Sequence, residues 1–252
     1  MRMSAPVFLV EDPESLANIA PAEVVALTGA EGHHASAVLR LRAGDEVDLV
    51  DGQGRRVGGT VVQTSRDRID VLATRIVDEP VPEPRIVVVQ ALAKGDRGEM
   101  AVEMLTEVGV DEIVPWAARR CVARWTGDRE RRGLDRWRAT SRAATKQSRR
   151  ARVPRIEAVR DTDGVAALVS GAALAVLLDA GASLPIGQMA VPLSGDILVI
   201  VGPEGGVDPE ERDRLVDAGA LAARLGPGIL RTSTAGAVAS GILLARTARW
   251  DS

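Results

Sequence analysis

The chain has 252 residues, of which 46 % are hydrophobic and 2 % aromatic, and its formal net charge is −3. One cysteine (Cys121) excludes an intrachain disulfide and a cysteine-rich zinc site, and two histidines are too few for a histidine-based metal cluster, so we expect no metal. The acidic start and the lack of a long apolar run predict a cytoplasmic protein without signal peptide or membrane contact.

The charge is distributed unevenly along the chain. The segment from Arg119 to Arg155 holds fourteen basic and three acidic residues, a net charge of +11, which leaves −14 on the remainder. A basic block on an acidic protein predicts a localised contact with a polyanion such as nucleic acid. The alternative is a solvated arginine-rich helix. Scarce aromatic residues argue against a protein that reads single strands mainly by base stacking.

Residues 1–77 are predicted to form a small β-rich domain. Short apolar runs separated by the turn Asp51–Gly54 indicate several short strands and a compact barrel. The expected strands are 7–10, 46–50, 57–63 and 67–77, with a short helix at 33–41. We interpret His33 and His34 as a helix cap or a surface contact.

Three prolines within residues 78–85 predict an extended linker and a domain boundary. After it, strand-like and helix-like segments alternate, which predicts an α/β domain over residues 86–252 with a mostly parallel sheet. Expected strands are 86–92, 112–116, 173–179, 197–201 and 221–225. Expected helices are 97–108 closed by Gly109, 128–151, 161–170, one capped by Asp208 before Pro209, and 232–249.

The predicted helix 128–151 carries a stripe of cations on one face. Arg131, Arg138, Arg142 and Arg149 are spaced by seven, four and seven residues, and Lys146 follows Arg142 by four. A row of cations along a helix can follow a phosphate backbone.

Two glycine-containing turns follow predicted strands, at Gly202–Gly206 and Leu225–Leu230. Neither contains a Walker lysine or a G-x-G-x-x-G pattern, which argues against triphosphate and dinucleotide sites. Glycines let backbone N–H and C=O groups approach a ligand, so two such turns can hold an adenine and a ribose. The alternative is a pair of ordinary strand-to-helix turns.

The strings VGPEGG and LGPGILRTSTA, at this spacing near the C-terminus, resemble the SPOUT superfamily of S-adenosylmethionine-dependent RNA methyltransferases. More narrowly, the chain resembles the bacterial family that methylates N3 of a uridine in 16S ribosomal RNA. The strings HHASAVLRLRAGDEVDLVDGQG, KGDRGEM with TEVGV, and AATKQSRR with VP carry the same resemblance. It covers nearly the whole chain.

The resemblance implies a PUA-like β-barrel over residues 1–77, a linker at 78–85, and a SPOUT domain over 86–252 whose C-terminal part forms a trefoil knot. It implies a homodimer that acts on 16S rRNA of the 30S subunit, with S-adenosyl-L-methionine bound at the knot. The implied cofactor-binding residues are Leu177, Leu178, Val201, Gly202, Pro203, Gly205, Gly206, Leu225, Gly226, Ile229, Leu230, Thr234 and Ala235.

Two residues are candidates for catalysis. A uridine N3 must lose its proton before it attacks a methyl group, and a cation then stabilises the charge on the flanking carbonyl oxygens. Arg231 is the candidate cation, the alternative being a phosphate or carboxylate anchor, and Glu204 is the candidate base, the alternative being a carboxylate that only orders backbone N–H groups. The expected RNA-binding residues are Arg40, Arg42, Lys94, Arg97, Arg138, Arg142, Lys146 and Arg149.

Three positions depart from the family pattern, namely Gly228, Ser233 and Met104, where Arg, Glu and Lys are common. These departures leave two alternatives open. The chain is a non-catalytic RNA-binding or ribosome-assembly protein, or it is a knotted methyltransferase that acts on a different RNA.

Overall fold

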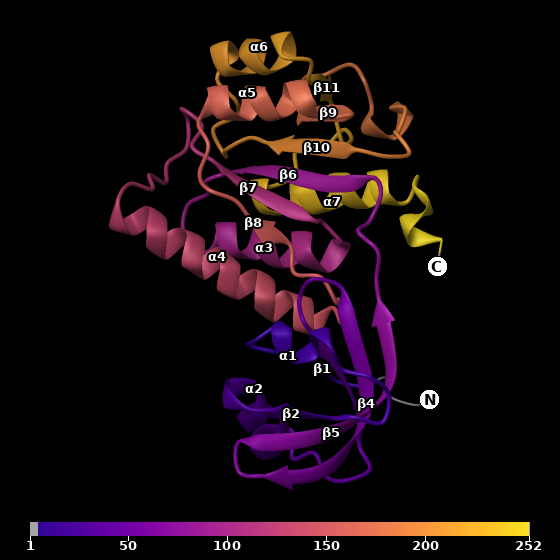
Figure 1. The fold of residues 1–252 in the computed structure, drawn as a ribbon. Coiled ribbons are helices and arrows are strands. Elements are labelled where there is room, and N and C mark those ends of the chain that lie inside the picture. The colour runs from indigo at the N-terminus through magenta and orange to yellow at the C-terminus, as the bar shows by residue number, and fades with distance from the viewer. Residues whose placement is uncertain (1–4, 252) are drawn as a thin grey trace. The chain divides into compact units, whose positions relative to one another are not determined.

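The computed structural model describes residues 5–251 and divides the chain into two compact units (Figure 1). The first unit combines the chain up to residue 81 with residues 145–153. The second unit contains residues 82–144 and the chain from residue 154 onward. Residues 1–4 and 252, which the predicted domain ranges include, lie outside the described residues.

The first unit is built on a five-stranded sheet in the order β1-β3-β4-β5-β2, with β1 parallel to β3 and the other pairs antiparallel. Alternate apolar side chains such as Val47, Leu49, Ile69 and Val71 are buried, as the period of a half-buried strand requires. Register shifts between β4 and β5 mark bulges, which bend the pair. The strands are β1 (Val7–Leu9), β2 (Val24–Leu27), β3 (Glu46–Val50), β4 (Arg55–Ser65) and β5 (Arg68–Asp78).

The helix predicted at 33–41 is placed differently in the structure. A four-residue helix, α1 (Glu14–Ala17), precedes it, and α2 (Gly29–His33) continues into a single π-helical turn at His34–Val38. The N–H of Leu39 bonds the carbonyl of His34, and Arg40 then adopts a left-handed φ of 55°, which ends the helical path. His33 makes a surface contact with Asp67, at 2.6 Å.

The second unit contains a six-stranded, fully parallel sheet in the order β11-β9-β10-β6-β7-β8, which confirms the predicted α/β class. The central strand β10 is buried from Ile197 to Val201. The strands are β6 (Arg85–Ala91), β7 (Glu112–Trp116), β8 (Arg155–Ile156), β9 (Leu174–Leu178), β10 (Asp196–Val201) and β11 (Leu221–Ala223).

Helices cover both faces of this sheet (Figure 1). The pair α5 and α6 packs on one side, and α3 packs against α7 on the other, where α7 also contacts β6 and β10. The helices are α3 (Arg97–Val108), α4 (Asp128–Gln147), α5 (Thr162–Gly171), α6 (Pro209–Asp217) and α7 (Thr232–Leu244), with 3₁₀ turns at Ile186–Gln188 and Ala248–Trp250.

Three predicted helix boundaries are confirmed by their capping geometry. The carboxylate of Asp161 accepts a hydrogen bond from the N–H of Gly164 at the start of α5, and Asp208 caps α6 in front of Pro209. Gly109 ends α3 in a left-handed conformation, with a φ of 106°.

Helix α4 ends four residues earlier than the sequence predicts, so Arg149 does not belong to its cation stripe. Arg149 adopts a φ of 57°, a conformation that glycine usually supplies. The N–H groups of Arg149 and Arg150 bond the carbonyls of Lys146 and Thr145, which is the Schellman pattern.

Helix α7 ends five residues before the predicted position because Arg249 is held by tertiary contacts. Its guanidinium donates to both carboxylate oxygens of Asp111, at 2.6 and 3.1 Å, and to the carbonyls of Pro84 and Gly109. The side chains of Arg249 and Asp111 are 13 % and 9 % exposed. This bidentate pair fixes the C-terminal segment against the ends of α3 and β6.

We predict that Arg249→Ala lowers the free energy of unfolding by about 3–5 kcal/mol, because it removes the bidentate guanidinium from a buried carboxylate. Arg214→Ala is the control, since its pair with Asp163 is exposed and contributes about 0–1 kcal/mol. Denaturant unfolding followed by tryptophan fluorescence measures both values. An equal, small loss in the two variants would contradict the prediction.

Candidate functional site

The carboxyl ends of β9, β10 and β11 lie side by side. Leu177 is paired with Ile200 of β10 and with Ala222 of β11, and all three strands run in the same direction. In an open parallel sheet this edge is where ligands bind. The predicted segments at Leu178, Val201–Gly206 and Leu225–Leu230 are therefore brought together at one edge of the second unit.

The first turn, Gly202–Gly206, is tightly packed against the chain that follows it. A Cβ atom at Gly202 would lie 2.6 Å from a methyl group of Val207, so any larger residue there would force that side chain to move. The hydroxyl of Thr232, at the start of α7, donates to the carbonyl of Gly202 at 3.2 Å. The amide of Gln90 donates to the Thr232 carbonyl at 3.4 Å. The turn is thus joined both to β6 and to the N-terminus of α7.

Glu204 lies in this turn and reaches the segment that follows β6. Its Oε1 accepts a hydrogen bond from the N–H of Lys94 at 3.4 Å and lies 3.5 Å from the Arg97 guanidinium. The Oε2 atom has no hydrogen-bond partner among the described residues. Glu204 therefore bonds Lys94 and Arg97 through one oxygen and leaves the other without a hydrogen bond to any described residue.

The second turn, Leu225–Leu230, leaves its main chain unused. The N–H groups of Gly226, Gly228 and Ile229 make no hydrogen bond within the described part of the chain. Its N-terminal end is anchored, because the guanidinium and N–H of Arg224 donate to carbonyls of the 182–184 loop. The turn therefore has free backbone N–H groups, while its first residues are held in place by the contacts of Arg224.

The start of α7 carries three of the predicted residues. Arg231 is the N-cap residue and its side chain is exposed, whereas Thr232 and Ser233 are buried. Thr234 and Ala235 donate their N–H groups to the carbonyl of Arg231. The N-terminus of α7 and the Arg231 guanidinium both contribute positive charge next to the two turns.

Asp179 follows β9 at the same edge and was not predicted as a site residue. Its carboxylate accepts hydrogen bonds from Arg212 at 2.9 Å and from the N–H of Gly181 at 2.8 Å. The contact with Arg212 lowers the pKa of Asp179 below its ordinary value of 3.8. Asp179 is therefore ionised at neutral pH and adds a negative charge beside Leu178.

The residues predicted to bind RNA are divided between the two units. Arg40, Arg42, Lys146 and Arg149 belong to the first unit, and Lys94, Arg97, Arg138 and Arg142 belong to the second. All are exposed except Lys146, which is partly buried and pairs with Glu31 at 2.5 Å. Arg138 pairs with Asp135 on the same helix face.

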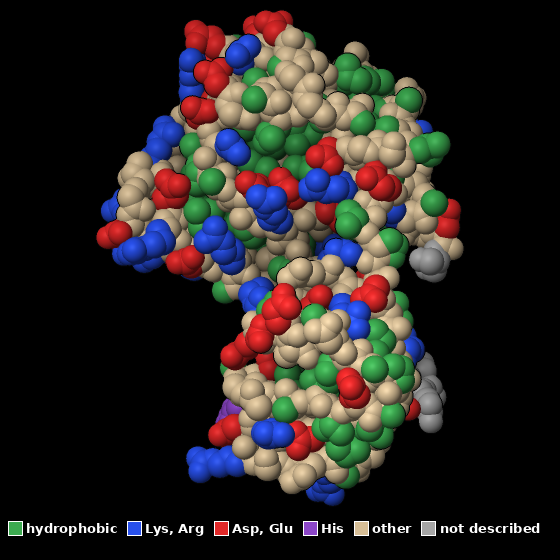
Figure 2. Space-filling model, in the orientation of Figure 1, with side chains coloured by type: hydrophobic (Ala, Val, Ile, Leu, Met, Phe, Trp, Pro, Cys, Tyr) green, Lys and Arg blue, Asp and Glu red, His purple; other side chains and the backbone are tan. Residues whose placement is uncertain are grey.

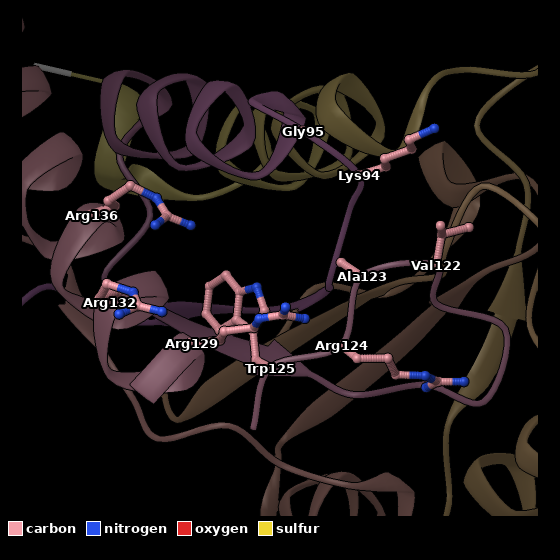
Figure 3. A pocket seen from close by; sticks show the side chains of 9 residues that line it. All are labelled: Lys94, Gly95, Val122, Ala123, Arg124, Trp125, Arg129, Arg132 and Arg136. Atoms are coloured by element: carbon pink, nitrogen blue, oxygen red, sulfur yellow. The ribbon is translucent and has the colours of Figure 1, made fainter. Parts of the chain in front are cut away.

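The structure also contains a basic pocket that the sequence analysis did not identify (Figure 3). Its volume is about 520 Å³, and its side chains come from the segment after β6, the segment before α4, and α4 itself. Figure 2 shows Lys and Arg side chains gathered along α4 in the second unit. The lining residues are Lys94, Gly95, Val122, Ala123, Arg124, Trp125, Arg129, Arg132 and Arg136.

A sequence signal for this pocket exists in hindsight. Arg129, Arg132 and Arg136 follow at steps of three and four, which places them on one helix face, and Trp125 precedes the helix by three residues. That row is a different one from Arg131, Arg138 and Arg142, which lie roughly 130° away around the axis at 100° per residue.

Other chemistries have little support in the described residues. Between residues 5 and 251, no group of three histidine, cysteine or acidic side chains could hold a metal ion. Burial raises the pKa of the Cys121 thiol, which makes it a poor nucleophile. No helix in the described ranges is long and apolar enough to span a membrane.

The parallel sheet and the two turns at its strand ends are compatible with an RNA methyltransferase, and sequence comparison shows that the chain is of this class. A profile of the RNA methyltransferase domain matches residues 80–244, and a profile of the RNA methyltransferase PUA domain matches residues 27–73. The chain is 44 % identical over 232 residues to ribosomal RNA small subunit methyltransferase E of Mycobacterium bovis, covering 90 % of this chain and 88 % of the relative. The chain therefore belongs to the ribosomal RNA small subunit methyltransferase E family, as the sequence resemblance indicated.

More distant relatives extend the comparison. Ribosomal RNA small subunit methyltransferase E of Bacillus subtilis is 26 % identical over 228 residues, covering 86 % of this chain and 88 % of that protein. A crystal structure of the Neisseria gonorrhoeae protein of the same name, bound to S-adenosyl methionine, superimposes with a TM-score of 0.82 at 25 % identity, covering 96 % of this chain and 98 % of that one.

We predict that Arg212→Met destabilises the protein at neutral pH but not in strong acid. The pKa of Asp179 is lower in the folded protein than in the unfolded chain, so the ionised carboxylate stabilises the fold. This stabilisation is complete at pH values above the ordinary carboxyl pKa, and it is lost as the pH falls through the lowered pKa. Since the pair is partly exposed, the loss at pH 7 is at most about 1 kcal/mol. Unfolding free energies measured from pH 7 to pH 2 test this, with Arg212→Lys as the charge-retaining control. A difference that persists unchanged at pH 2 would refute it.

Proposed function

We propose that the chain is a cytoplasmic S-adenosyl-L-methionine-dependent methyltransferase that methylates N3 of a uridine in 16S rRNA of the small ribosomal subunit. The observation that carries the proposal is the pair of glycine turns at one sheet edge, the first of which is bonded through Gly202 to Thr232 at the start of α7, the helix that follows the second turn. Membership of the family supports the same reaction. The bound S-adenosyl methionine in the Neisseria structure supports the cofactor.

The residues at this edge fit the cofactor chemically. An adenine and a ribose need hydrogen-bond donors and acceptors in a fixed arrangement. The second turn offers the N–H groups of Gly226, Gly228 and Ile229, which have no partner among residues 5–251. The exposed apolar side chains of Ile229 and Leu230 provide surface that a bound adenine would cover. We assign the cofactor to Leu177–Leu178, Val201–Gly206 and Leu225–Leu230, with Thr234 and Ala235 at the adjoining helix start.

The mechanism follows from which groups of this chain surround the reacting nitrogen. The cofactor supplies a methyl group already activated by its sulfonium. We propose that Glu204 receives the N3 proton through its unpaired Oε2 atom, while its Oε1 atom stays bound to Lys94. Arg231 at the N-terminus of α7 stabilises the charge that develops on the uridine carbonyl oxygens. Orientation of the uridine by these fixed elements contributes a further part of the rate.

Two structural features belong to the proposal rather than to the observed fold. We propose that the C-terminal segments form a trefoil knot and that the protein is a homodimer through α7. Exposed apolar residues near this helix, including Val238 and Trp250, support a protein partner there. The PUA domain would hold RNA through Arg40 and Arg42.

A second candidate function is binding of RNA without methyl transfer. It is favoured by Gly228, where the open surroundings would accept a side chain and none is present, and by the small Ser233. The residues at these two positions leave the backbone N–H groups of the second turn available. We therefore place methyl transfer ahead of RNA binding alone.

Transfer of labelled methyl from S-adenosyl-L-methionine to 30S subunits that lack the modification tests the proposal. We expect label at N3 of one 16S uridine, identified by nucleotide mapping. Cofactor binding by calorimetry without any labelled RNA would favour the second candidate. Label on another nucleotide or another RNA would move the assignment to a different methyltransferase substrate.

We predict that Glu204→Gln lowers kcat by about 10²–10⁴-fold, because the amide keeps the hydrogen bond to Lys94 but cannot accept the N3 proton. Cofactor affinity is expected to stay within about twofold. Glu210→Gln serves as the control, since Glu210 is exposed in the first turn of α6 and pairs with Arg119. Single-turnover kinetics measure both variants, and a Glu204→Gln enzyme as fast as Glu210→Gln would reduce Glu204 to a positioning role.

A further inference from the structure

The basic pocket beside the first turn has a combination of features that the proposed methyl transfer does not use. Its lining contains five cationic residues and no aspartate or glutamate. Its volume of about 520 Å³ falls in the range of about 300–1,000 Å³ typical of small-ligand sites. An anion of nucleotide size is therefore the expected occupant.

Trp125 gives this pocket an aromatic surface that is held in place. The indole rests on the backbone of α4 at Gly133, where a Cβ atom would lie 2.7 Å from the ring. Trp137 contacts it edge-on, with ring centroids 5.2 Å apart at 71°. Figure 3 shows the indole projecting into the middle of the pocket. The ring is pre-positioned and half-buried, which suits stacking against a planar group.

The arginines differ in how strongly the protein itself engages them. Arg129 and Arg132 have no side-chain hydrogen bond or ion pair with any described residue. Arg136 uses its Nε atom to bind Glu99 at 2.7 Å, and its guanidinium points toward Trp125, as does that of Arg132 (Figure 3). Arg124 instead bonds the carbonyls of Ala118 and Arg119, so it shapes the wall. Arg129, Arg132 and Arg136 are thus available to an anion.

The pocket also adjoins the candidate catalytic turn. Lys94 lines the pocket and donates its N–H to Glu204. The wall segment that contains Arg124 continues from Arg120, whose guanidinium reaches the carbonyl of Gly205 at 3.5 Å. A ligand in the pocket would therefore lie next to the residue proposed to accept the proton.

We propose that this pocket binds one unpaired nucleotide of the substrate RNA adjacent to the uridine that is methylated. Its base stacks on Trp125, and its phosphates are held by Arg129, Arg132 and Arg136. This inference rests on the proposed function, since it assigns the pocket to the same RNA. A cationic sulfonium cofactor does not suit a lining of five cations, whereas a phosphodiester with an aromatic base suits both the charge and the ring.

The test is fluorescence anisotropy of the full chain with a labelled octauridine RNA at several salt concentrations. The double variant Arg132→Ala/Arg136→Ala is expected to weaken binding at least about tenfold and to reduce the slope of log K against log salt by about 1.4, the value for two phosphate contacts to a single strand. The control, Arg155→Ala/Arg214→Ala, removes two exposed arginines from the same unit outside the pocket.

The aromatic contact is tested separately. Trp125→Leu is expected to weaken binding at least about fivefold, whereas Trp125→Phe keeps a ring and most of the affinity. Calorimetry with S-adenosyl-L-methionine checks that each variant is folded. Because Arg132 and Arg136 are exposed, their double variant decides the question if Trp125→Leu does not fold.

Three results would overturn the inference. One is a pocket double variant that binds no more weakly than the control, and another is Trp125→Leu matching the unmodified protein. The third is competition by uridine monophosphate or by a polyglutamate peptide as strong as that by octauridine, which would indicate a free-nucleotide or an acidic-peptide site. Since binding is measured without turnover, RNA bound in the pocket by a chain that transfers no methyl would refute the proposed function and the position beside a methylated uridine, and would leave only the nucleotide-binding role of the pocket standing.

Discussion

The parallel pairing of β10 between β9 and β6 is the constraint on which the second unit depends. Because β10 is buried along Ile197–Val201, its backbone must be paired on both sides, and its chain must leave the sheet abruptly at Gly202. A side chain at Gly202 would displace Val207, whose methyl group packs against the glycine. The same exit brings the Gly202 carbonyl to Thr232, so one turn determines where α7 begins.

This arrangement explains why the main chain rather than side chains dominates the candidate cofactor site. The first turn makes hydrogen bonds within the protein, from Thr232 to the Gly202 carbonyl and from the Lys94 N–H to Glu204. The second turn is anchored at Arg224 but leaves its N–H groups free. A rigid turn after β10 and an available turn after β11 therefore lie at the same sheet edge with β9 between their strands, and pre-positioned donors of this kind lose little entropy when a ligand binds.

Local chemistry made much of this predictable from the sequence. Apolar runs specified all the described strands except β2 and the two-residue β8, which the sequence did not predict. Asp161 and the Asp208–Pro209 pair specified two helix starts, and Gly109 specified a helix end. The features that the sequence did not predict depend on contacts between residues that are far apart in the chain. Arg149 takes a left-handed conformation usually left to glycine, and α7 stops early because Arg249 is drawn to Asp111. The pocket at Trp125 needed Gly133 beneath the ring and Trp137 at its edge, which no local pattern reveals.

The basic segment of the chain forms two separate rows of arginines on α4, although its composition indicates only one excess of positive charge. A net charge of +11 predicted a polyanion contact, and the stripe at Arg131, Arg138 and Arg142 was its expected form. In the folded chain a second row on α4 lines a pocket with an aromatic floor, whereas Arg138 is paired with Asp135 on the surface. Charge on an open surface attracts RNA without selecting a position, while cations around a fixed ring can hold one nucleotide in register. Selecting a single uridine requires the second kind of contact, close to the turn where the reaction is proposed to occur.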